Sequence, residues 1–114
     1  MRMWLVNPRF LCRKHLLGEH VEMHMFIGAI KKGISINGYI EKGLLETNRI
    51  ISRHDELAEE LIRRGYNHNS PVSSDFECPL PKGSVNIEKN IKELKIRCSD
   101  CCRLIELDDN LETK

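Results

Sequence analysis

The chain has 114 residues, which is enough for one domain with a single hydrophobic core and too few for two domains. Its residues are 40% hydrophobic and 31% charged, and its formal net charge is +1, which is the composition of a globular protein. No apolar run reaches the roughly 18 residues that are needed to cross a membrane. Aromatic residues make up only 5% of the chain, which argues against a sheet that binds nucleic acid by stacking bases on aromatic side chains.

The first predicted helix begins at Pro8, after an asparagine at position 7 that can cap it, and ends at Gly33. Six of its residues recur every three or four positions, which is helical spacing. They are Leu11, His15, Gly18, Glu22, Met25 and Ala29. Residues 34–46 contain two glycines and no clear period, so they predict a loop with a short turn.

A second helix is predicted from a cap at Thr47 to a terminating Gly65. Its predicted buried stripe consists of Ile50, Ile51, His54, Leu57, Leu61 and Ile62. Residues 66–83 are rich in proline, serine and asparagine and predict a long connection.

The third helix is predicted to open at Ser84 and to run without a break to about residue 105. Its predicted apolar stripe consists of Ile87, Ile91, Leu94, Cys98, Cys101 and Ile105. The sequence therefore predicts an all-α protein, a single compact domain of about three main helices over residues 1–105. Residues 106–114 are predicted to form an acidic, flexible tail.

Basic residues are concentrated in the first third of the chain. Residues 1–33 contain six Lys or Arg residues and two Glu residues, a local charge of +4, so the remainder sums to −3. The six are Arg2, Arg9, Arg13, Lys14, Lys31 and Lys32. One basic face on a nearly neutral protein fits a polyanionic ligand. A chance fluctuation of surface charge is the alternative.

The five cysteines do not suggest a disulfide framework, because the first residues lack the apolar segment of a secretory signal and predict an intracellular, cytoplasmic protein. Cys98 and Cys101 occupy predicted core positions, where a reduced cysteine behaves as a small apolar residue, and this interpretation is favoured. Two alternatives stay open for the run that ends at Cys102. One is a zinc site of Cys12, Cys78, Cys98 and Cys101, and the other is a redox pair.

Histidines are frequent on the first helix. His20 and His24 are one turn apart and could ligate a metal, although the zinc-protease signature needs a glutamate directly after the first histidine. His15, Glu19 and Glu22 lie on another face of this helix and would be too few ligands for a closed metal site unless His54 or His68 joined them. Structural, hydrogen-bonded histidines are the favoured interpretation, and a metal site is the alternative.

Several motifs occur in the order and spacing of a known family. They are Arg2-x-x-Leu5, His15-Leu16-Leu17-Gly18-Glu19-His20-x-Glu22, Gly28-Ala29 and Glu59-Glu60-Leu61-Ile62-Arg63-Arg64-Gly65-Tyr66-Asn67. Together they resemble the phage pyrimidine-dimer DNA glycosylases with abasic-site lyase activity, the UV-repair enzymes historically called endonuclease V. The resemblance covers about 100 residues.

The resemblance implies that an N-terminal α-amine, here that of Met1, attacks the deoxyribose and forms an imine. Such amines titrate at about 7.7–8.0, so a useful fraction is unprotonated at neutral pH. Glu22 matches the family's catalytic acid, and Arg2 matches a basic residue that holds DNA phosphate. His15 matches a histidine that orients Glu22 or the substrate.

The resemblance further implies damaged double-stranded DNA as partner, no cofactor, a monomer associated with the nucleoid when bound, and an N-terminus lodged near the first helix. The predicted DNA-contacting residues are Arg2, Arg13, Lys14, His15, His20, His24, Lys31 and Lys32.

The surface that reads the lesion departs from the family pattern. Val21 and Met25 occupy the positions of two arginines that help to read the dimer, and His20 and His24 replace an aromatic residue and a proline. A basic aromatic tail is also missing. We therefore expect weaker dimer specificity or a different lesion.

Three alternatives to a glycosylase with lyase activity stay open. They are a lyase for abasic sites only, a non-catalytic DNA- or RNA-binding module, and a metal-dependent hydrolase that uses the histidines.

Overall fold

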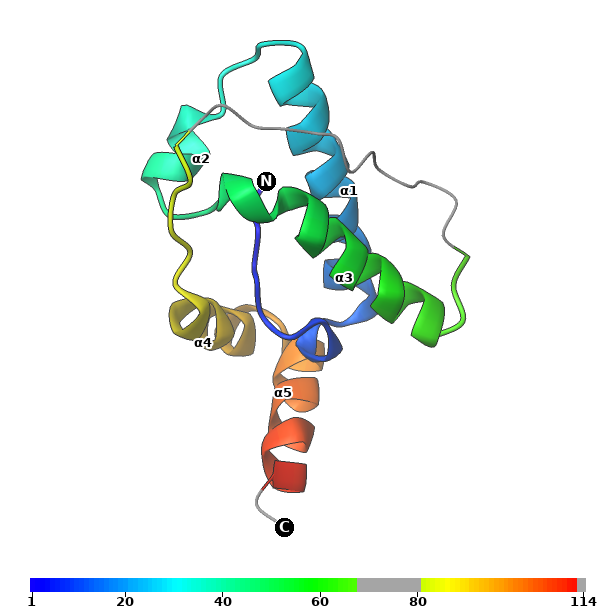
Figure 1. Ribbon diagram of the computed structural model, residues 1–114. Coiled ribbons are helices and arrows are strands. Elements are labelled where there is room, and N and C mark those ends of the chain that lie inside the picture. The colour runs from blue at the N-terminus through cyan, green and yellow to red at the C-terminus, as the bar shows by residue number, and fades with distance from the viewer. Residues whose placement is uncertain (68–80, 113–114) are drawn as a thin grey trace.

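The computed structural model describes residues 1–67 and 81–112, and this part of the chain is all-helical, without a strand (Figure 1). The all-α prediction is confirmed. In chain order the elements are η1 (Pro8–Phe10), α1 (Arg13–Lys31), α2 (Asn37–Glu41), η2 (Thr47–Arg49), α3 (Ile50–Arg63), α4 (Ile87–Arg97) and α5 (Ser99–Glu112), where η marks a short 3-10 helix.

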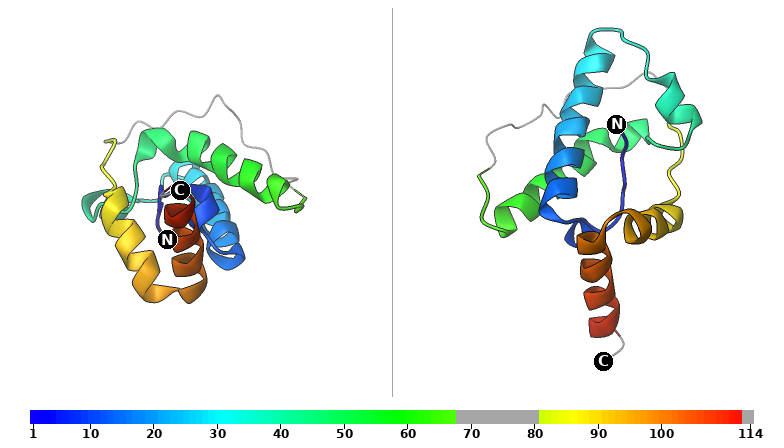
Figure 2. Two further views of the ribbon diagram at one scale, coloured as in Figure 1. Left: turned by 90° about the horizontal axis from the view of Figure 1, so that it is seen from below. Right: turned by 180° about the vertical axis from the view of Figure 1, so that it is seen from behind.

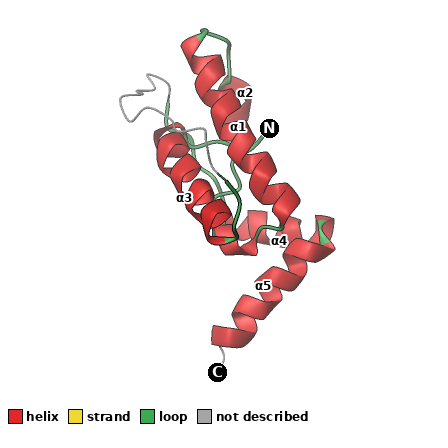
Figure 3. Cartoon of the chain, turned by 90° about the vertical axis from the view of Figure 1, so that its right-hand side faces the viewer, coloured by secondary structure: helices red, strands yellow, loops and turns green. Residues whose placement is uncertain are grey.

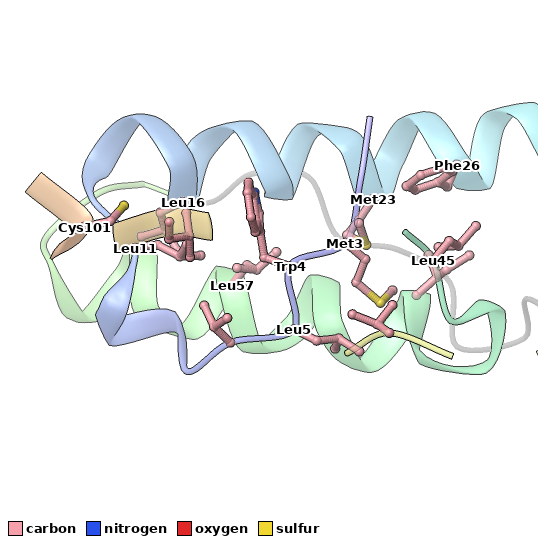
Figure 4. Packing of buried hydrophobic residues seen from close by; sticks show 14 of the residues in the cluster. Met3, Trp4, Leu5, Leu11, Leu16, Met23, Phe26, Leu45, Leu57 and Cys101 are labelled. Atoms are coloured by element: carbon pink, nitrogen blue, oxygen red, sulfur yellow. The ribbon is translucent and has the colours of Figure 1, made fainter. Parts of the chain in front are cut away.

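The first six residues form an extended segment that runs between α1 and α3 (Figure 4). Its four buried side chains are Met3, Trp4, Leu5 and Val6. Each fully buried apolar side chain contributes about 1.5–3 kcal/mol relative to an exposed one. The N–H of Met3 also donates to the carbonyl oxygen of Leu44 at 2.7 Å. The N-terminus is therefore held beside the first long helix, as predicted.

The first predicted helix is two elements. Asn7 caps only the short η1 turn, where its side chain accepts the N–H of Arg9 at 3.0 Å. The chain is extended at Leu11, which turns into the core with no exposed surface, and α1 starts after Cys12. Helical spacing alone does not reveal this interruption, because an apolar, buried Leu11 fits the pattern whether the segment is one helix or two elements.

The second predicted helix starts as the η2 turn and continues as α3, which lies across α1 (Figure 1). Thr47 does not cap it, because its hydroxyl donates to the carbonyl oxygen of Pro81 at 2.8 Å. Ile62 was predicted to be buried but is 59% exposed, since it lies about 100° around the helix from the buried Leu61. The short α2 helix occupies part of the predicted loop.

The prediction of one uninterrupted third helix is wrong. The segment divides into α4 and α5 at Cys98, whose backbone is extended (φ −137°, ψ 112°). The cap of α4 is Asn86, which accepts the N–H of Lys89 at 3.0 Å, rather than Ser84. Ile87 is 43% exposed and lies outside the core.

Helix α5 points away from the body of the domain (Figures 2 and 3). It continues to Glu112, so residues 106–112 of the predicted tail are helical. Residues 113–114 and residues 68–80 of the predicted connection lie outside the described part of the chain. Within the described part, none of the helices has the length and apolar character needed to span a bilayer.

Gly83 follows that connection at a close approach between two backbones. Its φ is +75°, and a Cβ at this position would overlap the carbonyl oxygen of Leu45. Only glycine fits both conditions without strain. The return of the chain to α4 therefore passes directly against the segment that precedes η2.

Candidate active site

The N-terminal segment places a carboxylate beside the start of the chain. The backbone N–H of Arg2 donates to Oε2 of Glu22, in the middle of α1, at 3.1 Å. Met1 is one peptide unit further and half-buried. The N-terminal segment thus lies against a residue 20 positions further along the chain. It brings the start of the chain, with the α-amine of Met1, beside the carboxylate of Glu22.

The guanidinium of Arg2 is bound to α4. It donates to Glu93 at 2.8 Å and to Asn90 at 2.6 Å, and it stacks 3.8 Å from the ring centroid of Trp4. The hydrogen bond from Arg2 holds the pKa of Glu93 below its usual range. Contact with a DNA phosphate, as predicted for Arg2, would have to compete with these bonds. In this arrangement Arg2 fixes the N-terminal segment against α4.

A buried ion pair supports the same segment from the other side. Arg53 on α3 binds both carboxylate oxygens of Glu19, with Nε at 2.6 Å and an amino group at 2.9 Å, and both side chains are almost fully buried. The N–H groups of Trp4 and Leu5 also donate to Glu19. Burial raises the pKa of Glu19, and these donors oppose that shift. The two N–H groups of the Arg53 guanidinium bind one carboxylate oxygen each, the bidentate geometry typical of an arginine–carboxylate pair.

Leu5 is the described non-glycine residue with a positive φ, at +57°. A bulky residue in this left-handed region costs about 1–3 kcal/mol and persists where its surroundings hold it. The bond from its N–H to Glu19 and the burial of its side chain supply that support. The bend directs the chain from the site toward η1.

One exposed stripe of α1 flanks Glu22. Its members are spaced three or four residues apart and thus share one side of the helix. They are Lys14, Gly18, Val21, Met25, Ala29 and Lys32, of which Ala29 is partly buried. The stripe carries a lysine at each end and two exposed apolar side chains in its middle, with Val21 54% and Met25 51% exposed.

Other predicted DNA-contacting residues lie on a different side of α1. Arg13, His20, His24 and Lys31 are separated by seven, four and seven positions, so they share the side that faces α3. The guanidinium of Arg13 lies 5.5 Å from the ring centroid of Tyr66, just after α3. The eight predicted residues are therefore not on one face.

Three histidines meet between α1 and α3. Nε2 of His54 lies 3.1 Å from Nε2 of His20 and 3.1 Å from Nε2 of His24. Nδ1 of His54 is 2.9 Å from a carboxylate oxygen of Asp55. His54 thus joins the pair predicted from the sequence, while His68 lies outside the described residues. Three converging ring nitrogens could hold a transition metal.

His15 is turned toward sulfur rather than bonded to Glu22. Its Nδ1 lies 3.2 Å from Sγ of Cys12 and 3.5 Å from Sγ of Cys101. Burial lowers the pKa of His15, and Lys14 lowers it further, which favours the neutral imidazole. Cys98 completes this group, whereas Cys78 lies outside the described residues.

A pocket of about 110 Å³ opens beside Arg2. Lys42, after α2, and Lys89, on α4, both line it and are exposed. Sequence reasoning missed these two lysines, and it also missed Asn90 and Glu93. No motif marks them, because they reach the site only through tertiary packing.

Comparison with known proteins agrees with these observations. A family model described as pyrimidine dimer DNA glycosylase matches residues 1–74, about two thirds of the 114 residues. The match includes the N-terminal segment, α1 and α3, and it ends before α4 and α5. Comparisons with curated proteins and with solved structures give no match.

Proposed function

Because this chain belongs to the pyrimidine dimer DNA glycosylase family, we propose that it excises damaged bases from DNA through the α-amine of Met1 and then cleaves the strand as a lyase. The observation that carries the proposal is the 3.1 Å bond from the N–H of Arg2 to Glu22. It places the carboxylate one residue from the amine that would attack, which is the pairing of nucleophile and acid–base group that the reaction needs.

In the proposed reaction the amine attacks C1′ of the deoxyribose, the glycosidic bond breaks, and the departing base takes up a proton. Ring opening and loss of a proton from nitrogen then give an imine between the amine and C1′. The imine acidifies the C2′ proton, and Glu22 accepts it. The electron pair left at C2′ expels the phosphate on the 3′ side, so the strand breaks by β-elimination.

The exposed stripe on α1 is the proposed DNA-facing surface. Lys14 and Lys32 can bind phosphates on either side of the lesion, because they precede and follow Glu22 along the helix on a stripe about 80° around it from Glu22. C1′ is not open to attack in a stacked duplex, so the damaged nucleotide has to be extruded. Val21 and Met25 are apolar groups that can fill the space it leaves.

We expect Lys14→Ala and Lys32→Ala each to weaken DNA binding and to reduce the salt dependence of log K by about 0.9. The physical reason is that each variant removes one ammonium group that neutralises a DNA phosphate. The matched controls are Arg13→Ala and Lys31→Ala, which remove the same charge from the side that faces α3. Fluorescence anisotropy at several salt concentrations makes the comparison, and equal slopes for all four variants would contradict the assigned surface.

The function itself is tested by borohydride trapping of the untagged protein. Duplexes with a cyclobutane dimer, with an abasic site or with neither are incubated with protein and borohydride, which reduces an imine to a stable amine. Trapping on the dimer duplex supports the glycosylase with lyase activity, and trapping on the abasic duplex alone reduces the proposal to a lyase. Absence of trapping on both contradicts the imine mechanism.

A further inference from the structure

We propose that Cys12, His15, Cys98 and Cys101 form a zinc site. The four ligand atoms lie within 4.8 Å of one another. They come as two pairs from two segments distant in the sequence, the start of α1 and the junction of α4 with α5. Both pairs have two intervening residues, Cys-x-x-His and Cys-x-x-Cys, which is a spacing typical of zinc ligands.

The distances fit a tetrahedral ion. Zinc bonds of about 2.3 Å to sulfur and 2.0–2.1 Å to nitrogen place two sulfurs about 3.8 Å apart, and a sulfur and a nitrogen about 3.6 Å apart. Sγ of Cys12 and Sγ of Cys98 are 3.9 Å apart. The two contacts from Nδ1 of His15 to sulfur are 3.2 and 3.5 Å. A disulfide would use two of these sulfurs and would not explain why His15 points at the same centre.

Backbone N–H groups point at two sulfurs of the cluster. The N–H of Cys12 donates to Sγ of Cys101 at 3.2 Å, and the N–H of Cys101 donates to Sγ of Cys98 at 3.5 Å. Cys12 precedes α1 and Cys98 precedes α5, so both sulfurs lie at helix N-termini, where the helix dipole stabilises negative charge. The break at Cys98, which the sequence pattern did not predict, turns its sulfur into this cluster.

Four protein ligands leave no open position, so the site is structural rather than catalytic. It would join α5 and the end of α4 to the start of α1, across about 86 residues of sequence. Figure 4 shows Cys101 at one end of the core, on the side where α5 leaves the domain. The ion would fix the helix that otherwise extends from the body, and this role does not depend on the proposed glycosylase activity.

Cobalt(II) titration of the reduced full-length protein tests the site. We expect binding with an intense sulfur-to-cobalt charge-transfer band, and we expect zinc to displace the cobalt. Cys98→Ser should weaken or remove this band, whereas Cys102→Ser should keep it, because Sγ of Cys102 bonds instead to Glu106 at 3.6 Å. A wild-type protein that binds no cobalt, or that binds it without the sulfur band, would overturn the proposal even if a variant fails to fold.

A second and independent inference concerns His20, His24 and His54. We infer that their Nε2 atoms bind one divalent transition metal, with zinc as the best match. In a tetrahedral site two ligating nitrogens lie about 3.3 Å apart, and the two distances from His54 are both 3.1 Å. Asp55 lies at Nδ1 of His54, where a carboxylate typically orients a ligating imidazole.

This site is tested by metal stoichiometry in the same titration. We expect a further equivalent of cobalt with weak visible bands and no added sulfur band. His24→Gln should lose this equivalent and keep the sulfur band, while Met25→Gln, at the neighbouring exposed position, should keep both. A wild-type protein whose only bound cobalt shows sulfur coordination would contradict the histidine site, as would unchanged stoichiometry in His24→Gln.

Discussion

Replacement of Glu22 by glutamine is expected to lower the rate of strand cleavage by roughly 10²–10⁴-fold, the usual contribution of a positioned acid–base group. The amide has the shape of the carboxylate and can still accept the N–H of Arg2, so the N-terminal segment should stay in place. It cannot accept the C2′ proton, and it carries no charge to stabilise the cationic sugar. Single-turnover cleavage of an abasic duplex measures the effect.

Binding must be measured on the same variant. Glu22→Gln should bind the duplex with an affinity close to that of the wild type, because the residue is proposed to act in the reaction and not in phosphate recognition. Its thermal unfolding should also be nearly unchanged. Cleavage by Glu22→Gln at a rate near that of the wild type would show that the acid–base assignment is wrong.

The second large effect is expected in stability. Glu19→Gln leaves the guanidinium of Arg53 buried with a neutral partner, and loss of one member of a buried pair costs about 3–5 kcal/mol. The side chains of Arg53 and Glu19 are 1% and 0% exposed, so solvent cannot compensate. The variant also weakens the bonds that hold the N–H groups of Trp4 and Leu5. Urea denaturation measures the free energy of unfolding.

Glu56→Gln is the matched control for this prediction. Glu56 binds the same guanidinium at 3.2 Å, but its side chain is 49% exposed. An exposed ion pair contributes about 0–1 kcal/mol, so the control should lose little stability. If Glu19→Gln and Glu56→Gln lower the free energy of unfolding equally, the buried pair does not have the structural role assigned to it.

The sequence predicted the long helices because their apolar residues repeat with helical spacing. It placed α3 to within about three residues, merged η1 with α1, whose start it set five residues too early, and merged α4 with α5. The merger has a physical cause: Leu94, Cys98 and Cys101 keep helical spacing across the break, so the pattern is the same for one helix as for two. The extended backbone at Cys98 leaves no mark on this pattern.

The candidate site was predictable only as far as the resemblance to a known family extends. The resemblance to a known family singled out Met1, Arg2 and Glu22, and the bond between Arg2 and Glu22 agrees with it. The partners of Arg2 on α4 could not be predicted, since Asn90 and Glu93 are 88 and 91 residues away in the sequence. Spacing along one helix gives no information on such contacts.

The two histidine environments show the same limit. The sequence predicted that His20 and His24 could act together, because residues one helical turn apart share a face. It could not establish that His54 on α3 meets them, which depends on how α3 crosses α1. His15 was assigned to Glu22 by resemblance, but its nearest described partners are the sulfurs of Cys12 and Cys101.

The central claim is that the α-amine of Met1 is the nucleophile, and the site of the trapped adduct tests it most directly. The untagged protein is trapped with borohydride on a damaged duplex, digested with nuclease and protease, and analysed by tandem mass spectrometry. We predict that the reduced sugar adduct is found on the α-nitrogen of Met1. An adduct on a lysine side chain, with the N-terminal peptide unmodified, would contradict the proposed mechanism.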